Sequence, residues 1–118
     1  MKFLVFAGST RTQSFNRRLA AVAAHMARDA GAEVTLIVGP VHLPTPRGVQ
    51  RINVQSASNM LESVVQHAQL ATIFIATAAV ADWRPAAQYE QKIKKDGSGQ
   101  MPVLEFVENP DILATVAQ

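Results

Sequence analysis

The 118-residue chain contains no cysteine, which excludes disulfide bonds, thiolate metal sites and a cysteine nucleophile. Aromatic residues make up only 6% of it, so it offers few surfaces on which nucleic-acid bases could stack. No apolar run approaches the ~18 residues that a membrane helix needs, and the opening run over 1–7 is too short for a signal peptide. These absences favour a cytoplasmic protein that neither binds nucleic acid nor spans a membrane.

Hydrophobic residues make up 48% of the chain, a proportion typical of a globular protein, and the length suits one domain over residues 1–118. Eleven Lys and Arg against nine Asp and Glu give a formal net charge of +2, which argues weakly for anionic partners. Two basic groups stand out, one of arginines at 11, 17 and 18 and one of lysines at 92, 94 and 95. Because no aromatic residues are interleaved with them, small phosphorylated ligands fit them better than nucleic acid does.

The hydrophobic pattern predicts alternating strands and helices. Residues 2–7 form a continuous apolar run typical of a buried parallel strand, and apolar residues recur at helical spacing from 15 to 30, before Gly31. A second β-branched run over 33–38 completes a strand–helix–strand unit with a right-handed crossover. Further on, the pattern predicts a surface connection over 40–48, a strand over 51–54 and a helix from the N-cap Ser56 to about Gln69. A central strand over 71–79 is expected to follow, and then an exposed arm over 86–99. The chain is predicted to end with a strand over 103–107 and a short helix over 111–118 with Pro110 in its first turn. We therefore expect a three-layer α/β fold, Rossmann-like or flavodoxin-like, with a mostly parallel sheet of four or five strands.

Hydroxyl and basic side chains follow the first predicted strand, where open α/β sheets bind ligands. Hydroxyls, amides at a helix N-terminus and a guanidinium all complement phosphate oxygens; alternatively, Ser14 only caps the helix and Ser9 and Thr10 only turn the chain. The pattern Gly-Ser-x-Arg-x-x-Ser-x-Asn over 8–16 resembles the FMN-binding loop of the NAD(P)H-dependent FMN reductases, a likeness that covers about residues 1–37. This resemblance implies a flavodoxin-like reductase module whose phosphate or FMN contacts are Ser9, Thr10, Arg11, Ser14 and Asn16.

Residues 32–118 carry four further motifs in order. They are Gly-Pro-Val-His-Leu-Pro-Thr-Pro over 39–46, Ala-Ala-Val-Ala-Asp-Trp-Arg over 78–84, Glu-Gln-Lys-Ile-Lys-Lys over 90–95, and Asn-Pro-Asp-Ile over 109–112. Together they resemble the phosphopantothenate-cysteine ligase half of the bifunctional coenzyme A biosynthesis flavoprotein. The resemblance implies a CTP site, used with Mg²⁺, that is lined by Ala76, Thr77, Ala78, Asp82, Lys92, Pro110, Asp111, Ile112 and Leu113. Lys92 would be the catalytic residue facing the reacting phosphates.

Each of these residues also has a simpler interpretation. In the simpler interpretation, Lys92 and its neighbours at 94 and 95 are an ordinary run of solvated charges. Asp111 is then a carboxylate in the first turn of a helix, where the helix dipole favours it. Asp82 could accept hydrogen bonds from a nucleotide or orient a metal ion. Trp83 and Tyr89 are expected to pack rather than to stack on a ligand. The histidines at 25, 42 and 67 share no metal-ligand spacing, so no protein-held metal site is predicted.

Two departures from the ligase pattern lower the expected activity. The family's segment with the substrate-facing Asn has no counterpart after the first strand, and the family continues beyond the point where this chain stops, so we expect weak or absent turnover. The change of resemblance near residues 37–38 suggests a junction between two families, and a non-catalytic engineered scaffold is a third alternative. Because the ligase family dimerises and an unfinished sheet leaves unpaired edges, a homodimer is possible.

Overall fold

The computed structural model describes residues 1–7, 15–42, 44–78, 80–87, 94–95 and 97–118. Four parallel strands form one sheet in the order β3-β2-β1-β4. Their bounds are Lys2–Ala7 for β1, Glu33–Val38 for β2, Gln50–Asn53 for β3 and Ile73–Ala76 for β4. This is the strand order of a Rossmann sheet, whereas flavodoxin-like sheets run 2-1-3-4-5. The predicted three-layer, mostly parallel α/β fold is confirmed in its Rossmann-like form.

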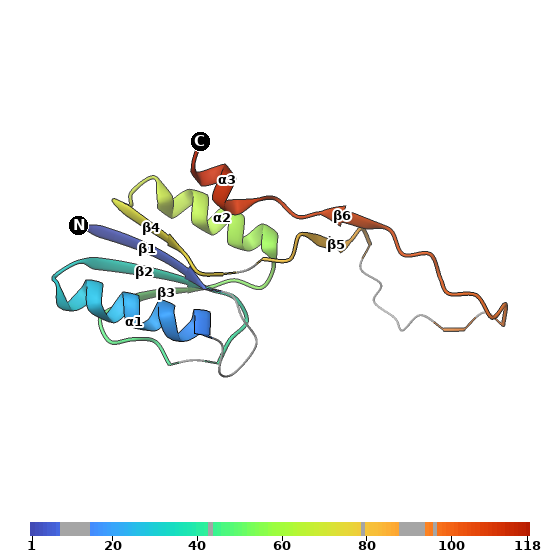
Figure 1. Ribbon diagram of the computed structural model, residues 1–118, viewed down its shortest axis with the longest axis horizontal. Helices are drawn as coiled ribbons and strands as arrows, with labels where there is room; N and C mark the ends of the chain where they lie inside the picture. Colours follow the sequence, from blue (N-terminus) through green and yellow to red (C-terminus); the bar gives the residue numbers. More distant parts are fainter. Residues whose placement is uncertain (8–14, 43, 79, 88–93, 96) are drawn as a thin grey trace.

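Helices cover both faces of this sheet (Figure 1). Helix α1 (Phe15–Asp29) lies on one face, and α2 (Ala57–Ala68) with the short α3 (Ile112–Val116) lies on the other. Neighbouring side chains of one strand point to opposite faces, so the sheet supports two hydrophobic cores. The first joins Ala20 and Ala24 of α1 to strand residues that include Val5, Val34 and Leu36. The second joins Leu4 and Ile37 to Met60 and Val64 of α2 and to Ile112 of α3.

The helix boundaries follow local signals in the sequence. Gly31 ends α1 with a positive φ of 82°, and the neighbouring Ala32 N–H donates to the Ala27 carbonyl at 2.9 Å. Ser56 caps α2, since its hydroxyl accepts the Asn59 N–H at 3.1 Å. Both predictions are confirmed. At α3 the N-cap is Asp111, so Pro110 precedes the helix instead of standing in its first turn.

Strand β4 has a different place from the predicted central one. Among the described residues it pairs only with β1, which puts it at an edge of the sheet. Both of its faces are partly covered, because the half-buried Phe74 packs against the core below α2 and the half-buried Ile75 packs against the core below α1, while Ile73 is exposed. An apolar run therefore shows that a strand is covered by helices, but not where it stands in the strand order.

A two-stranded ribbon projects from this body (Figure 1). It is formed by β5 (Trp83–Pro85) and β6 (Phe106–Glu108), which pair antiparallel. The radius of gyration is 17.4 Å, against about 13.5 Å for a compact domain of this length. Of the predicted arm over 86–99, residues 86–87, 94–95 and 97–99 are exposed, and the others, Tyr89 among them, lie outside the described residues. The last predicted strand belongs to the ribbon rather than to the main sheet.

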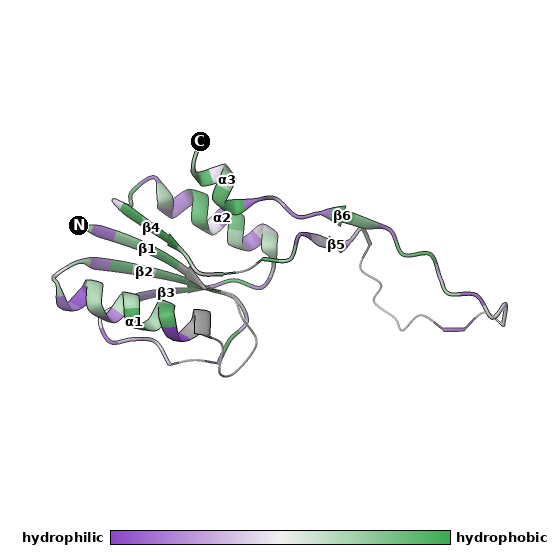
Figure 2. Ribbon diagram, viewed as in Figure 1, coloured by the Kyte–Doolittle hydropathy of each residue, from purple (hydrophilic) through white to green (hydrophobic). Residues whose placement is uncertain are grey.

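The ribbon leaves apolar side chains uncovered. Trp83 is 60% exposed, so the prediction that it packs is wrong, because two strands alone bury neither face. Figure 2 shows hydrophobic residues continuing along β6, away from the body. No helix in the described part of the chain is long and apolar enough to cross a membrane.

Candidate functional site

A cavity of about 310 Å³ opens at the carboxyl end of β4, between the base of the ribbon and α3. Ligands of open α/β sheets bind outside the carboxyl ends of the strands, so its position suits a binding site. One side is formed by the segment that leaves β4 and the other by the segment that enters α3. Its lining consists of Ala76, Ala78, Val80, Ala81, Asp82, Glu108, Asn109, Pro110, Asp111, Ile112 and Leu113.

Most of the predicted nucleotide-binding residues meet at this cavity. Those that line it are Ala76, Ala78, Asp82, Pro110, Asp111, Ile112 and Leu113. Thr77 is not part of the lining, and because side chains alternate along an extended segment, its neighbours Ala76 and Ala78 share the opposite side. Lys92 lies outside the described residues. Four lining residues were not predicted as site residues: Val80, Ala81, Glu108 and Asn109. The signal that could have found them is the sequence itself, since the first two and Asn109 lie inside the quoted motifs and Glu108 directly precedes one.

The two sides of the cavity are joined through Asn109. Its backbone N–H donates to the Asp82 carbonyl at 2.6 Å, and its side-chain Nδ2 donates to the Ala81 carbonyl at 2.7 Å. Its Oδ1 accepts a hydrogen bond from Nη1 of Arg84 at 2.8 Å. The segment before the ribbon is thus tied to the segment after it.

Helix α3 is fixed to the body at its first residues. Oδ1 of Asp111 accepts the Ala114 N–H at 2.9 Å, and the Asp111 carbonyl accepts the Thr115 hydroxyl at 2.6 Å. Ile112 is 4% exposed and belongs to the core below α2, whereas Leu113 is 56% exposed. Asp111 therefore has a capping role of its own, close to its simpler interpretation from the sequence.

The cavity is acidic. Asp82, Glu108 and Asp111 line it, and no Lys or Arg is among the described residues of its lining. Carboxylates repel a phosphate at short range, so a phosphorylated ligand would need cations from elsewhere. Lys94 and Lys95 are exposed on the arm. Among the described residues, no three His, Cys, Asp or Glu side chains are grouped to hold a metal ion; Mg²⁺ usually keeps water ligands and binds through one or two carboxylates plus substrate phosphates, which this site would allow.

Most of the predicted FMN loop falls outside the described residues. This holds for Ser9, Thr10, Arg11 and Ser14, while Asn16 is the second residue of α1 and its side chain is not described. The strand before the loop, β1, has Phe6 paired in register with Ala76 of β4. The carboxyl end of β1 therefore lies at the same edge of the sheet as the acidic cavity. Phosphate or FMN binding by these residues stays a prediction.

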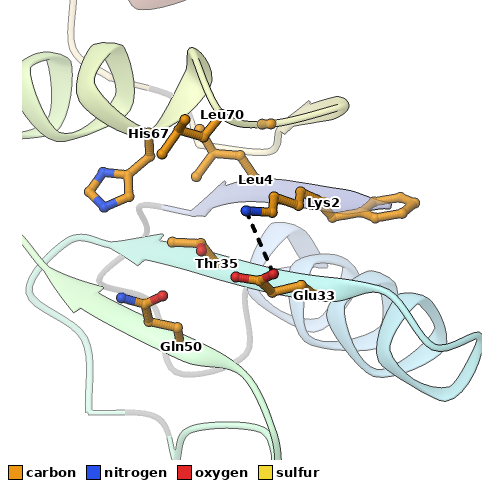
Figure 3. A pocket seen from close by; sticks show the side chains of 9 residues that line it. Lys2, Leu4, Glu33, Thr35, Gln50, His67 and Leu70 are labelled. Atoms are coloured by element: carbon orange, nitrogen blue, oxygen red, sulfur yellow. Dashed lines mark ion pairs between the residues drawn. The ribbon is translucent and has the colours of Figure 1, made fainter.

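A second cavity, of about 250 Å³, lies at the opposite edge, where the strands begin (Figure 3). Lys2 faces Glu33 across it, with Nζ 3.9 Å from Oε2. His67 lies above them on α2, and its Nδ1 donates to the Ser63 carbonyl at 2.7 Å. Because the Lys2 and Glu33 charges cancel and the amino ends of an open sheet are not its usual ligand edge, this cavity is the weaker candidate.

An open parallel α/β sheet with its cavity at the carboxyl end is the architecture of small-ligand-binding Rossmann-like domains. The family described as "DNA/pantothenate metabolism flavoprotein C-terminal domain" matches residues 17–118. The chain belongs to this family.

Relatives named "Coenzyme A biosynthesis bifunctional protein CoaBC" agree with that assignment. The protein from Vibrio cholerae is 46% identical over 125 aligned positions, covering 98% of this chain and 31% of the relative. The one from Escherichia coli is 48% identical over 98 positions, covering 82% of this chain and 24% of the relative. A crystal structure of the C-terminal domain of CoaBC superposes with a TM-score of 0.77 at 34% identity, covering 98% of this chain and 57% of that one.

The chain thus spans about a third of the length of these curated relatives. The alignment with the Vibrio cholerae protein covers 98% of the chain, so it includes residues on both sides of positions 37 and 38. One natural relative accounts for both segments, which leaves the predicted junction between two families without support. The resemblance of residues 1–37 to FMN reductases is likewise not shown by these relatives.

Proposed function

We propose that the acidic cavity binds CTP and that the chain is part of a phosphopantothenate-cysteine ligase of coenzyme A biosynthesis. The observation that carries this proposal is the meeting of two separate motifs, Ala76–Asp82 and Pro110–Leu113, at one cavity on the ligand edge of the sheet. Membership of the pantothenate metabolism family and the names of the relatives support it.

In the proposed reaction a carboxylate of phosphopantothenate attacks the α-phosphorus of CTP, pyrophosphate leaves, and the amine of cysteine then displaces CMP from the acyl-cytidylate. Negative charge builds on the phosphoryl oxygens during the first step, so positioned cations would stabilise its transition state. The described residues of the cavity supply carboxylates rather than cations. We therefore assign the stabilising charge to Lys92 on the arm and to Mg²⁺ carried by the nucleotide phosphates.

The ribbon joins the body at this cavity. It begins at Trp83, next to Asp82 of the cavity, and returns at Glu108, which also lines it. Its far part extends away from the body (Figure 1).

We also propose that the chain forms a homodimer through this ribbon. The ribbon and the segment that leads into β6 expose several large apolar side chains: Trp83, Met101, Val103, Leu104, Phe106 and Val107. Exposed apolar patches are typical of protein interfaces. Sedimentation of the purified chain at several concentrations tests the proposal, and a monomer at all concentrations contradicts it.

Thermal melting with separate ligands tests the nucleotide proposal. A ligand that binds only the folded state stabilises it by about 2.7 kcal/mol at one hundred times its Kd. We expect CTP with Mg²⁺ to raise the melting temperature in a concentration-dependent way, and pyrophosphate with Mg²⁺ controls for phosphate binding alone. If FMN raises it and CTP does not, the flavin module is the better assignment. If neither does, the chain has lost the site or lacks a part of it, and the proposal fails for these 118 residues.

A further inference from the structure

Asn109 uses both the nitrogen and the oxygen of its side-chain amide to hold two chain segments together. Nδ2 donates to the Ala81 carbonyl at 2.7 Å, and Oδ1 accepts from Arg84 at 2.8 Å. Turning the amide over would place its oxygen against a carbonyl and its NH₂ against a guanidinium, so both bonds would be lost. The two partners therefore fix the amide in one orientation.

Arg84 extends this arrangement into the ribbon. Its Nη1 also donates to the Glu108 carbonyl at 2.9 Å, while its own backbone is paired with Val107 across the ribbon. The bonds of Arg84 and Asn109 thus surround the point where the ribbon joins the body. The same two residues link the Ala81–Asp82 side of the cavity to the Asn109–Asp111 side.

Neither residue takes part in the cores below α1 and α2, and all three of their side-chain hydrogen bonds lie at the surface. Hydrogen bonds at such a place contribute little to the stability of the whole fold. They do restrict the distance between the two sides of the cavity and the angle at which the ribbon leaves it. A role in positioning explains why the half-buried Asn109 and the exposed Arg84 make three side-chain hydrogen bonds at this one place.

We infer that Asn109 is a positioning residue which, with Arg84, sets the spacing of the two cavity walls and the angle of the ribbon. The inference rests on the nucleotide site proposed above for its effect on CTP, but the geometric part stands by itself. Without the clamp formed by these two residues, the walls and the ribbon move independently. Nucleotide affinity then falls because a correctly spaced site is only a fraction of the population.

The test compares Asn109→Ala, Arg84→Gln and the double variant with the control Glu105→Gln. The control changes an exposed side chain of the ribbon and keeps the backbone bond from the Ala86 N–H to the Glu105 carbonyl. Calorimetric titration measures the Kd for CTP with Mg²⁺. Hydrogen exchange of the ligand-free protein measures opening of residues 80–87 and 105–112, and is independent of any effect of charge on CTP.

We expect Asn109→Ala to raise the Kd by about threefold to tenfold, the scale of one or two hydrogen bonds. Exchange should become faster in 80–87 and 105–112 and stay unchanged in β1 and β2, with little change in melting temperature. The double variant should lose less than the product of the two single effects, because both substitutions break the same bond.

Two results overturn the inference. One is that Asn109→Ala shows the same hydrogen-exchange rates and the same Kd for CTP as the control Glu105→Gln. The other is faster exchange throughout the sheet with a large fall in melting temperature, which shows a purely structural role. If the unaltered chain does not bind CTP, the proposed function fails, while local exchange in the variants still decides whether the clamp exists.

Discussion

Replacing Ile112 by Ala should detach the wall of the acidic cavity that α3 provides. Ile112 is 4% exposed and packs with Leu4, Ile37 and Val64 in the core below α2. The substitution removes three carbon atoms from that core, and each buried CH₂ contributes about 0.8 kcal/mol to the free energy of unfolding. The cavity left behind adds to this loss. Isoleucine-to-alanine changes in a core therefore cost about 2 to 5 kcal/mol of stability. Because α3 has only five residues and cannot persist undocked, it can leave the sheet without unfolding it. We therefore expect the free energy of unfolding to fall by about 2 kcal/mol, the lower end of that range.

The neighbouring residue supplies the matched control. Leu113 also lines the cavity but is 56% exposed, so Leu113→Ala should cost less than about 0.5 kcal/mol, as surface substitutions do. Urea denaturation of both variants, followed by far-ultraviolet circular dichroism, gives the free energy of unfolding. A loss of 2 kcal/mol corresponds to a fall of about 8 °C in melting temperature. Equal losses at the two positions would refute the claim that Ile112 anchors α3.

Three further predictions concern two glycines, a helix cap and a lysine. Gly31→Ala should lower the free energy of unfolding by about 1 kcal/mol because of the φ of 82° alone. Gly48→Ala should lower it further in the same thermal melts, since Gly48 has a φ of 76° and the new Cβ would lie 2.7 Å from Cδ of Arg28; equal losses would show that Arg28 moves away freely. Ser56→Ala should lower the free energy of unfolding by about 1 kcal/mol through loss of the α2 cap, and Ser56→Asp, which can still cap, should preserve it; identical losses in both variants would exclude the capping role. Lys92→Ala should weaken CTP binding by about 1 to 3 kcal/mol, the scale of a charge-assisted hydrogen bond, without changing the melting temperature of the ligand-free chain; unchanged affinity in a titration would remove Lys92 from the site.

The sequence alone determined the elements whose signals are local. Strand β1, helix α1 and strand β2 follow from hydrophobic periodicity, and the ends of the helices follow from Ser56 and Gly31, because capping depends on residues within one turn of the helix. The motifs of residues 39–46, 78–84 and 109–112 also pointed to the right family. Each of these inferences uses residues that lie close together in the chain.

Only the tertiary structure decided the features that join distant segments. The edge position of β4 depends on which strands pair, and the placement of residues 106–108 in a ribbon depends on pairing with Trp83–Pro85. The clamp brings Asn109 to Ala81, which is 28 residues away in the sequence. Hydrophobic periodicity reports whether a segment is buried, but hydrogen bonds between polar side chains and distant backbone leave no periodic trace in the sequence. The sequence motifs therefore named most of the residues that line the cavity, whereas the spacing of its two walls came from the fold.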